Sequence, residues 1–172
     1  TVTGAASLFR RELLDLVLPF PEPVGDPFHD QWIAAVALAA GEIAYVDRPL
    51  YDYVQHGGAA RGHEAAMRSW DAGRLLDRRD PKGTWRRVRA HADRSYETNV
   101  RRIALSAREI EARLGGRMRP DKARAVRRLA RLDRSLASVP WLARRSLRRL
   151  GGRSETMGIE RSLLAAILLH RR

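Results

Sequence analysis

Apolar residues in the first third of the chain change their spacing along the sequence. In residues 8–18 they recur every three or four positions with charged residues between them, which predicts an amphipathic helix. The prolines of residues 19–23 end that helix and favour an extended segment. Residues 31–40 are apolar on nearly every side, which predicts a buried helix that Gly41 stops. Residues 42–54 then alternate between apolar and polar positions, which is typical of a strand.

The remainder of the chain has helical spacing almost throughout. Its longest segment, 85–114, carries one continuous apolar stripe and stops at Gly115 and Gly116. Thr84 stands directly before this segment as a candidate N-cap. We therefore expect a predominantly helical protein. The predicted helices of this part are 63–79, 85–114, 120–136, 140–150 and 159–170.

Residues 159–170 contain the most apolar run of the chain. A transmembrane helix needs about 20 apolar residues, so this run is too short to span a bilayer. Two interpretations stay open. The helix packs against the core, or it lies in a membrane interface with Arg161, Arg171 and Arg172 at its flanks.

Charge divides the chain into two parts, 1–60 and 61–172, which we interpret as two domains. The first part has three basic and eight acidic residues and a net charge of −5. The second part has a net charge of +18, so the whole chain carries +13. Arginine supplies 31 of the 33 basic residues, a bias that the codon usage of a GC-rich genome also produces. Two interpretations of the basic helices stay open. They form a solvated surface, or they contact the anionic inner leaflet of a membrane. Nucleic acid is the disfavoured partner, because no recognised binding motif occurs and the aromatic residues fall on apolar faces or at helix starts.

The chain has no cysteine, which excludes disulfides and cysteine-ligated metal sites and fits a reducing cytoplasm. No signal peptide pattern, a basic stretch followed by an apolar one, precedes the first predicted helix. The chain begins abruptly at Thr1 with an extended run that has no preceding partner strand. We therefore expect a piece of a longer cytoplasmic protein.

Two positions in residues 26–58 carry candidate chemistry. Asp30 stands at the start of the predicted buried helix, where a carboxylate caps backbone N–H groups or serves as a general base. His56 ends the extended run and is followed by Gly57 and Gly58, which allow close approach to phosphate oxygens. It either makes a hydrogen bond at a strand end or contacts a metal or a diphosphate.

The residues around these two positions resemble the C-terminal, acceptor-side part of a family 2 glycosyltransferase of the rhamnosyltransferase-like kind. His29-Asp30-x-Trp32 looks like the His-Asp-x-Trp motif of that family. Tyr53 to Gly57 is similar to its Tyr-x-x-His-Gly signature. The resemblance covers about the first third of the chain and implies an α/β remnant of a GT-A fold in residues 1–60, followed by a helical extension.

The resemblance also implies roles for these residues. Asp30 is the general base on the acceptor hydroxyl, and His29 and Trp32 are walls of the acceptor site. His56 contacts the donor diphosphate or a divalent metal, Mn²⁺ or Mg²⁺. Val54 stands where relatives often have Arg, and Ala59 where they often have Asn, so polar contacts beside His56 are fewer here.

The nucleotide-binding half of such enzymes, with its Asp-x-Asp metal motif, has no counterpart in this sequence. We therefore expect the chain to be inactive without that half. The intact enzyme would transfer a sugar, for example rhamnose, from a nucleotide-sugar donor to a surface polysaccharide or lipid-linked glycan, at the inner face of the plasma membrane. The alternative is a non-catalytic helical adaptor that binds an anionic membrane or nucleic acid.

Overall fold

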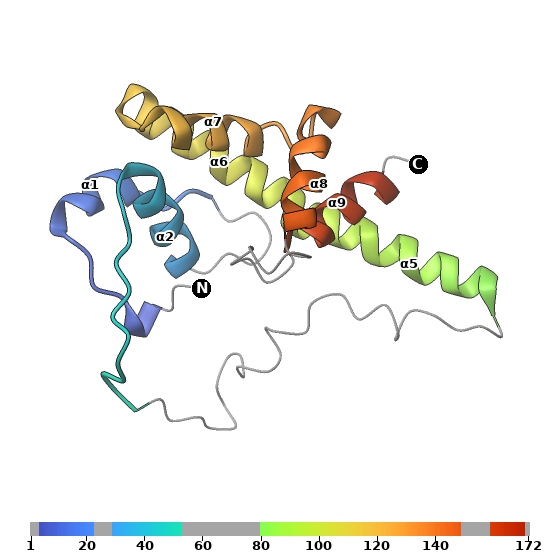
Figure 1. Ribbon diagram of the computed structural model, residues 1–172, viewed down its shortest axis with the longest axis horizontal. Helices are drawn as coiled ribbons and strands as arrows, with labels where there is room; N and C mark the ends of the chain where they lie inside the picture. Colours follow the sequence, from blue (N-terminus) through green and yellow to red (C-terminus); the bar gives the residue numbers. More distant parts are fainter. Residues whose placement is uncertain (1–3, 23–28, 53–79, 149–158, 171–172) are drawn as a thin grey trace.

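The computed structural model describes residues 4–22, 29–52, 80–148 and 159–170 (Figure 1). All regular secondary structure in these residues is helical, so the predominantly helical prediction is confirmed. The predicted α/β remnant is wrong for the described part of residues 1–60, which contains no strand. Residues 42–52 run without a sheet partner in the described structure and are exposed throughout. Alternation of apolar and polar positions was not sufficient, because a strand exists only where a second strand takes its backbone hydrogen bonds.

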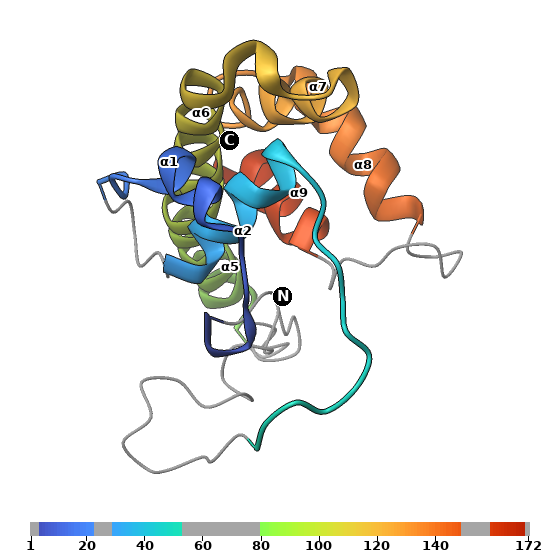
Figure 2. The same cartoon turned by 90° about the vertical axis from the view of Figure 1, so that its left-hand side faces the viewer.

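The spine of the molecule is the long helical stretch from residue 81 to residue 114 (Figures 1 and 2). It consists of α5 (Pro81–Ser95), a π-helical turn (Tyr96–Arg101) and α6 (Arg102–Leu114). The predicted long helix is confirmed, and the π-helical turn within it is a feature that the sequence pattern does not predict. Its N-cap is Asp80, whose side chain accepts a hydrogen bond from the Gly83 N–H, so the prediction of Thr84 as the cap is wrong.

The π-helical turn has a basis in the apolar spacing. Ala92, Tyr96, Val100 and Ala104 are all buried and follow one another at intervals of four residues. Four residues turn an α-helix through about 400°, so such a stripe drifts by about 40° at each step. The i→i+5 bonding of a π-turn widens the helix locally and reduces this drift. The wider turn therefore keeps these four residues on the buried side.

Two apolar clusters lie along this spine. The N-terminal cluster joins α1 (Leu14–Val17) and α2 (His29–Ala40) to α6 and to α7 (Pro120–Leu129). The C-terminal cluster joins the π-helical turn and the start of α6 to α8 (Val139–Arg148) and α9 (Ile159–His170). Leu129 of α7 packs against both clusters. The two parts of the chain that charge separates therefore share one helical support.

Short helical turns complete the described chain. Gly4–Ala6, Arg11–Leu13, Gly115–Arg117 and Leu136–Ser138 form 3-10 turns. Gly115 has a φ of 48°, a left-handed conformation that glycine adopts without strain, and it ends α6 as predicted. Gly41 follows α2, where its N–H bonds to Ala37 O at 2.8 Å, as expected of a helix stop.

The first and second predicted helices differ from expectation in extent and burial. The helix predicted over residues 8–18 is reduced to the turn Arg11–Leu13 and α1, and Leu8 is fully exposed. α2 has its predicted position, but Leu38 is 51% exposed, so the helix is not buried on every side. The helix predicted over residues 63–79 lies outside the described residues.

α9 packs inside the molecule rather than standing apart from it. Leu163, Ala166 and Ile167 are buried in the C-terminal cluster. The His170 ring stacks on Tyr96 with 4.0 Å between ring centres, and His170 Nδ1 lies 2.7 Å from Asp93 of α5. Of the two interpretations of this segment, packing against the core is confirmed. None of the described helices combines the length and apolar composition that crossing a bilayer requires.

Candidate functional site

The start of α2 meets the 3-10 turn at Gly4. The Gly4 N–H donates a hydrogen bond to Asp30 Oδ2 at 3.1 Å, across 26 positions of sequence. A Cβ atom added to Gly4 would lie 2.9 Å from His29 Nε2 and 3.6 Å from the Asp30 Cβ. Because real Cβ atoms do not approach so closely, glycine at position 4 allows the turn to lie against His29 and Asp30. The structure thus brings two separate sequence segments together at the His29-Asp30 pair.

The carboxylate of Asp30 is held by backbone groups on both oxygens. Its Oδ1 accepts a hydrogen bond from the Gln31 N–H at 2.7 Å, and its Oδ2 accepts the one from Gly4. Asp30 is the second residue of α2, where unsatisfied N–H groups and the helix dipole favour a negative charge. Each carboxylate oxygen can accept a further hydrogen bond. The half-buried, oriented carboxylate of Asp30 can therefore accept a hydrogen bond from the hydroxyl group of a ligand.

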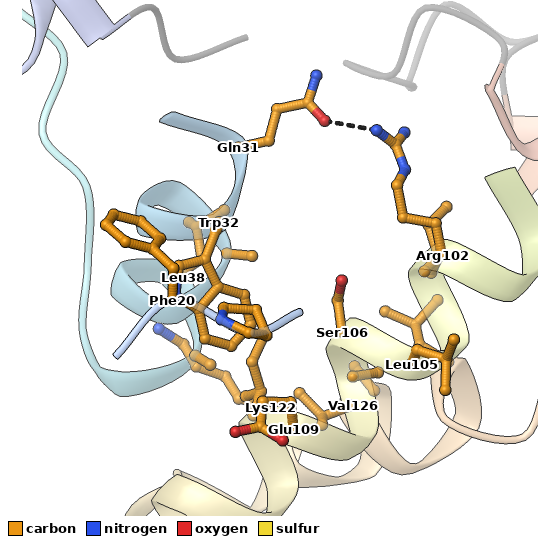
Figure 3. A pocket seen from close by; sticks show the side chains of 18 of the residues that line it. Phe20, Gln31, Trp32, Leu38, Arg102, Leu105, Ser106, Glu109, Lys122 and Val126 are labelled. Carbon is orange, nitrogen blue, oxygen red and sulfur yellow. Dashed lines mark hydrogen bonds between the residues drawn. The ribbon is translucent and has the colours of Figure 1, made fainter. Parts of the chain in front are cut away.

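A cavity of about 920 Å³ runs along α2 from His29 to Ala39, between α2 on one side and α6 and α7 on the other (Figure 3). His29 and Trp32 line it, whereas Asp30 does not and faces Gly4 instead. Most of the lining is apolar. Its larger apolar members include Phe20, Trp32, Leu38, Leu105, Ile110 and Val126. The structure therefore places two of the three predicted residues of the motif on a cavity wall and the third beside it.

Polar side chains from two helices meet across this cavity. Figure 3 shows Gln31 of α2 reaching toward Arg102 of α6, whose guanidinium donates a hydrogen bond to Gln31 Oε1 at 2.9 Å. Arg102 also contacts Asn99 at 3.5 Å. Ser106, Glu109 and Lys122 are further polar lining residues. The cavity thus combines a large apolar surface with a few oriented hydrogen-bonding groups, a combination that binding sites share.

Trp32 is held rigidly in the wall of the cavity. Its side chain is only 6% exposed, and its indole N–H donates to Val17 O at 3.0 Å. The guanidinium of Arg113 lies 5.1 Å from the ring centre. The N–H of Trp32 is thus used inside the protein, and only part of the ring is available to a ligand.

Arg113 is the main supporting residue that inspection of the sequence missed. It donates hydrogen bonds to the carbonyl oxygens of Leu16, Val17 and Pro19 at 3.2, 2.8 and 2.7 Å. Leu16 and Val17 are the last residues of α1, so Arg113 satisfies two acceptors that the helix itself leaves open, and it also holds the segment after the helix through Pro19 O. The sequence offered one signal, the i,i+4 spacing of Glu109 and Arg113, which form a 2.7 Å ion pair. That spacing indicates an ordinary surface pair and gives no sign of a contact with α1.

The residues that the structure describes do not provide a metal site. They contain no group of three or more His, Asp or Glu side chains placed to hold a cation. His56, the predicted metal or diphosphate contact, lies outside the described residues, as do Val54 and Ala59.

Comparison of the chain with protein-family models, with curated proteins and with solved structures finds no match in any of the three.

Proposed function

We propose that this chain is the acceptor-side, C-terminal part of a GT-A-type glycosyltransferase, followed by a basic helical extension. The observation that carries the proposal is the convergence of Gly4, His29 and Asp30 beside the cavity that His29 and Trp32 line. The resemblance selects His29, Asp30 and Trp32 from the sequence alone. Their position at one helix end, with an oriented carboxylate next to the cavity wall, supports a role in acceptor activation.

In the proposed reaction Asp30 takes the proton of an acceptor hydroxyl while that oxygen bonds to the anomeric carbon of the donor sugar. The bond from the anomeric carbon to the nucleoside diphosphate breaks, and the diphosphate leaves. A sugar hydroxyl is a weak nucleophile, so a positioned base contributes about 10²–10⁴-fold to the rate. His29 and the accessible part of the Trp32 ring would bound the acceptor, with the Gln31 amide nearby.

The exposed apolar surface of residues 8–51 supports the view that a further half is needed. Ten of the fifteen exposed large apolar side chains in the described structure lie in this range. Five of them, Ile43, Tyr45, Val46, Leu50 and Tyr51, lie in the extended segment that has no sheet partner there. Five exposed apolar side chains within nine residues of chain offer apolar surface that a partner can cover. The nucleotide-binding half, which would also carry the metal ligands, is the partner we propose for it.

The test compares this chain with the protein extended to the natural start of its reading frame. Release of nucleoside diphosphate from a panel of nucleotide sugars, including a rhamnose donor, is measured with Mn²⁺ and with Mg²⁺. We expect activity only in the extended protein, and a loss of about 10²–10⁴-fold on Asp30→Asn. Asp15→Asn, which changes an exposed carboxylate of α1, is the matched control and should keep full activity. An inactive extended protein, or an Asp30→Asn variant with unchanged rate, would refute the proposal.

One observation favours a second candidate function, a non-catalytic helical adaptor. The C-terminal cluster is built from residues 96–167, and no described residue of the first 60 contributes to it. The π-helical turn, α8 and α9 thus share a core that is separate from α1 and α2, as a binding module needs. An extended protein that has no transfer activity but binds an anionic membrane or a nucleic acid would favour the adaptor, and transfer activity without such binding would exclude it.

A further inference from the structure

Basic side chains are concentrated in the segment that contains α7 and α8. Residues 120–148 hold nine basic residues and two acidic residues. Asp121 forms an ion pair with Arg119, just before α7. The carboxylate of Asp133 is ion-paired with Arg108 of α6, and its side chain is 13% exposed. The positive charge of this segment is therefore not neutralised from within it.

α7 and the turn that follows it present four exposed arginines in one row. Three of them belong to α7 at spacings of three and four residues, which places them on one helix face, and the fourth lies in the turn. The opposite face, with Ala123, Val126 and Ala130, is buried in the N-terminal cluster. Two carboxylates lie near the row: Glu111, 3.5 Å from Arg127, and Asp121, three residues before the first arginine on α7. The row consists of Arg124, Arg127, Arg128 and Arg131, and the exposed Arg134 follows it.

α8 adds apolar side chains to this outward surface. Pro140, Arg144 and Leu147 are exposed at spacings of four and three, whereas Leu142 on the other side is buried in the C-terminal cluster. Leu147 is 65% exposed, and Leu136, just before α8, is 52% exposed. Exposed leucines beside arginines form an amphipathic surface rather than a purely charged one.

Trp141 joins the two helices into one surface. Its ring lies between Arg128 of α7, at 5.8 Å, and Arg145 of α8, at 5.3 Å. Ser138 Oγ also donates a hydrogen bond to Arg128 O at 3.0 Å. Figure 2 shows α7 across the top of the molecule and α8 descending at its edge, both on the outside of the helical arrangement. The arginine row and the start of α8 are thus fixed next to each other, and Leu147 follows six residues beyond Trp141 on α8.

We propose that this α7–α8 surface docks the protein on an anionic lipid bilayer, with the arginines at the headgroup phosphates and Leu136 and Leu147 in the interface below them. The charge complementarity carries the assignment, because anionic lipids attract each nearby basic residue. The two leucines supply apolar area that a headgroup layer can bury. α9, the most apolar segment, is not part of this surface, because Leu163, Ala166 and Ile167 are buried in the C-terminal cluster.

A bilayer fits this surface better than a nucleic acid does. Phosphates of either partner would bind the arginines. Single-stranded nucleic acid also needs aromatic faces on which bases stack, and the Trp141 ring lies between two guanidinium groups. Exposed leucines gain nothing from a phosphate backbone, whereas a lipid interface buries them.

The test measures co-sedimentation of the chain with phosphatidylcholine vesicles that contain or lack phosphatidylglycerol, at physiological ionic strength. The variant Arg124→Gln/Arg131→Gln/Arg134→Gln should bind the anionic vesicles more weakly by about one to two orders of magnitude, since each basic residue contributes about fivefold. Leu136→Ser/Leu147→Ser should also bind more weakly. Circular dichroism verifies that each variant keeps its helices.

Matched controls come from other helices. Arg86→Gln/Arg89→Gln/Arg94→Gln removes the same charge from exposed positions of α5, and Ile159→Ser/Leu168→Ser changes two exposed apolar residues of α9. We expect both to bind like the unchanged protein. Equal weakening by the two arginine triples would mean that total charge, not this surface, determines binding, and would overturn the proposal. Binding to single- or double-stranded oligonucleotides with no binding to anionic vesicles would overturn it as well. The assay does not measure sugar transfer. A failure of this docking proposal is therefore distinguishable from a failure of the proposed function.

Discussion

The guanidinium of Arg113 lies 5.1 Å from the centre of the Trp32 ring, and both side chains donate a hydrogen bond to the same oxygen, Val17 O. This carbonyl ends α1, the ring belongs to α2 and the guanidinium belongs to α6. One backbone oxygen thus connects three helices of the N-terminal cluster. The candidate site is built on this connection, because Trp32 forms part of the cavity wall.

Arg113→Ala should lower the free energy of unfolding by about 2–4 kcal/mol, because hydrogen bonds from a charged donor contribute about 1.5–3 kcal/mol and the carbonyls lose their partner. Denaturation by urea, followed by circular dichroism, measures the change. Arg89→Ala on the exposed side of α5 is the control and should change stability by less than about 0.5 kcal/mol. Equal effects of the two substitutions would contradict the role of Arg113.

Trp32→Phe should have an effect that depends on Arg113. In the unchanged protein Val17 O keeps the hydrogen bond from Arg113, so the loss of the indole N–H should cost about 1 kcal/mol or less. In an Arg113→Ala background the same carbonyl would lose both donors, and the cost should rise by about 1 kcal/mol or more. A double-mutant cycle measures this coupling. Strictly additive effects would show that the shared acceptor has no energetic consequence.

Gly4→Ala should leave stability nearly unchanged but impair sugar transfer by the extended protein. The added Cβ displaces the imidazole of His29, which is the end of a flexible and exposed side chain. The displacement disturbs the pair that we propose at the acceptor, so the KM for acceptor should rise. Gly41→Ala is the control, since its Cβ would meet no atom closer than 3.8 Å. Equal sugar transfer by the Gly4→Ala and Gly41→Ala proteins would show that the close packing of Gly4 against His29 and Asp30 has no role in the reaction.

Gly83→Ala should be nearly neutral alone and stabilising when Asp80 is removed. Replacing glycine by alanine inside a helix gains about 1 kcal/mol, but the new Cβ would occupy the place of the Asp80 carboxylate, whose cap contributes about 1 kcal/mol. In an Asp80→Ala background that loss has already occurred, so Gly83→Ala should raise stability by about 1 kcal/mol. Thermal unfolding of the four proteins tests this prediction. A full gain in the presence of Asp80 would show that the cap does not depend on Gly83.

The long helical stretch illustrates what could be predicted from the sequence. Its apolar stripe, from Ala92 to Leu114, is a local pattern, and Gly115 with its positive φ ends it. The π-helical turn was not predicted, because it arises from small adjustments that keep Tyr96 and Val100 on the buried side. The cap was assigned to Thr84 rather than Asp80, since both residue types cap helices and the sequence does not distinguish them.

The sequence by itself determined the helical character, most of the helix ends, the separation of charge and the motif at the start of α2. These properties depend on spacing and on residues close together in the chain. Only the tertiary structure decided which carbonyls Arg113 reaches, that Gly4 lies against Asp30, and that residues 42–52 find no strand partner in the described residues. Each of these depends on groups far apart in sequence, and no periodicity encodes which distant backbone atoms will come within hydrogen-bonding distance.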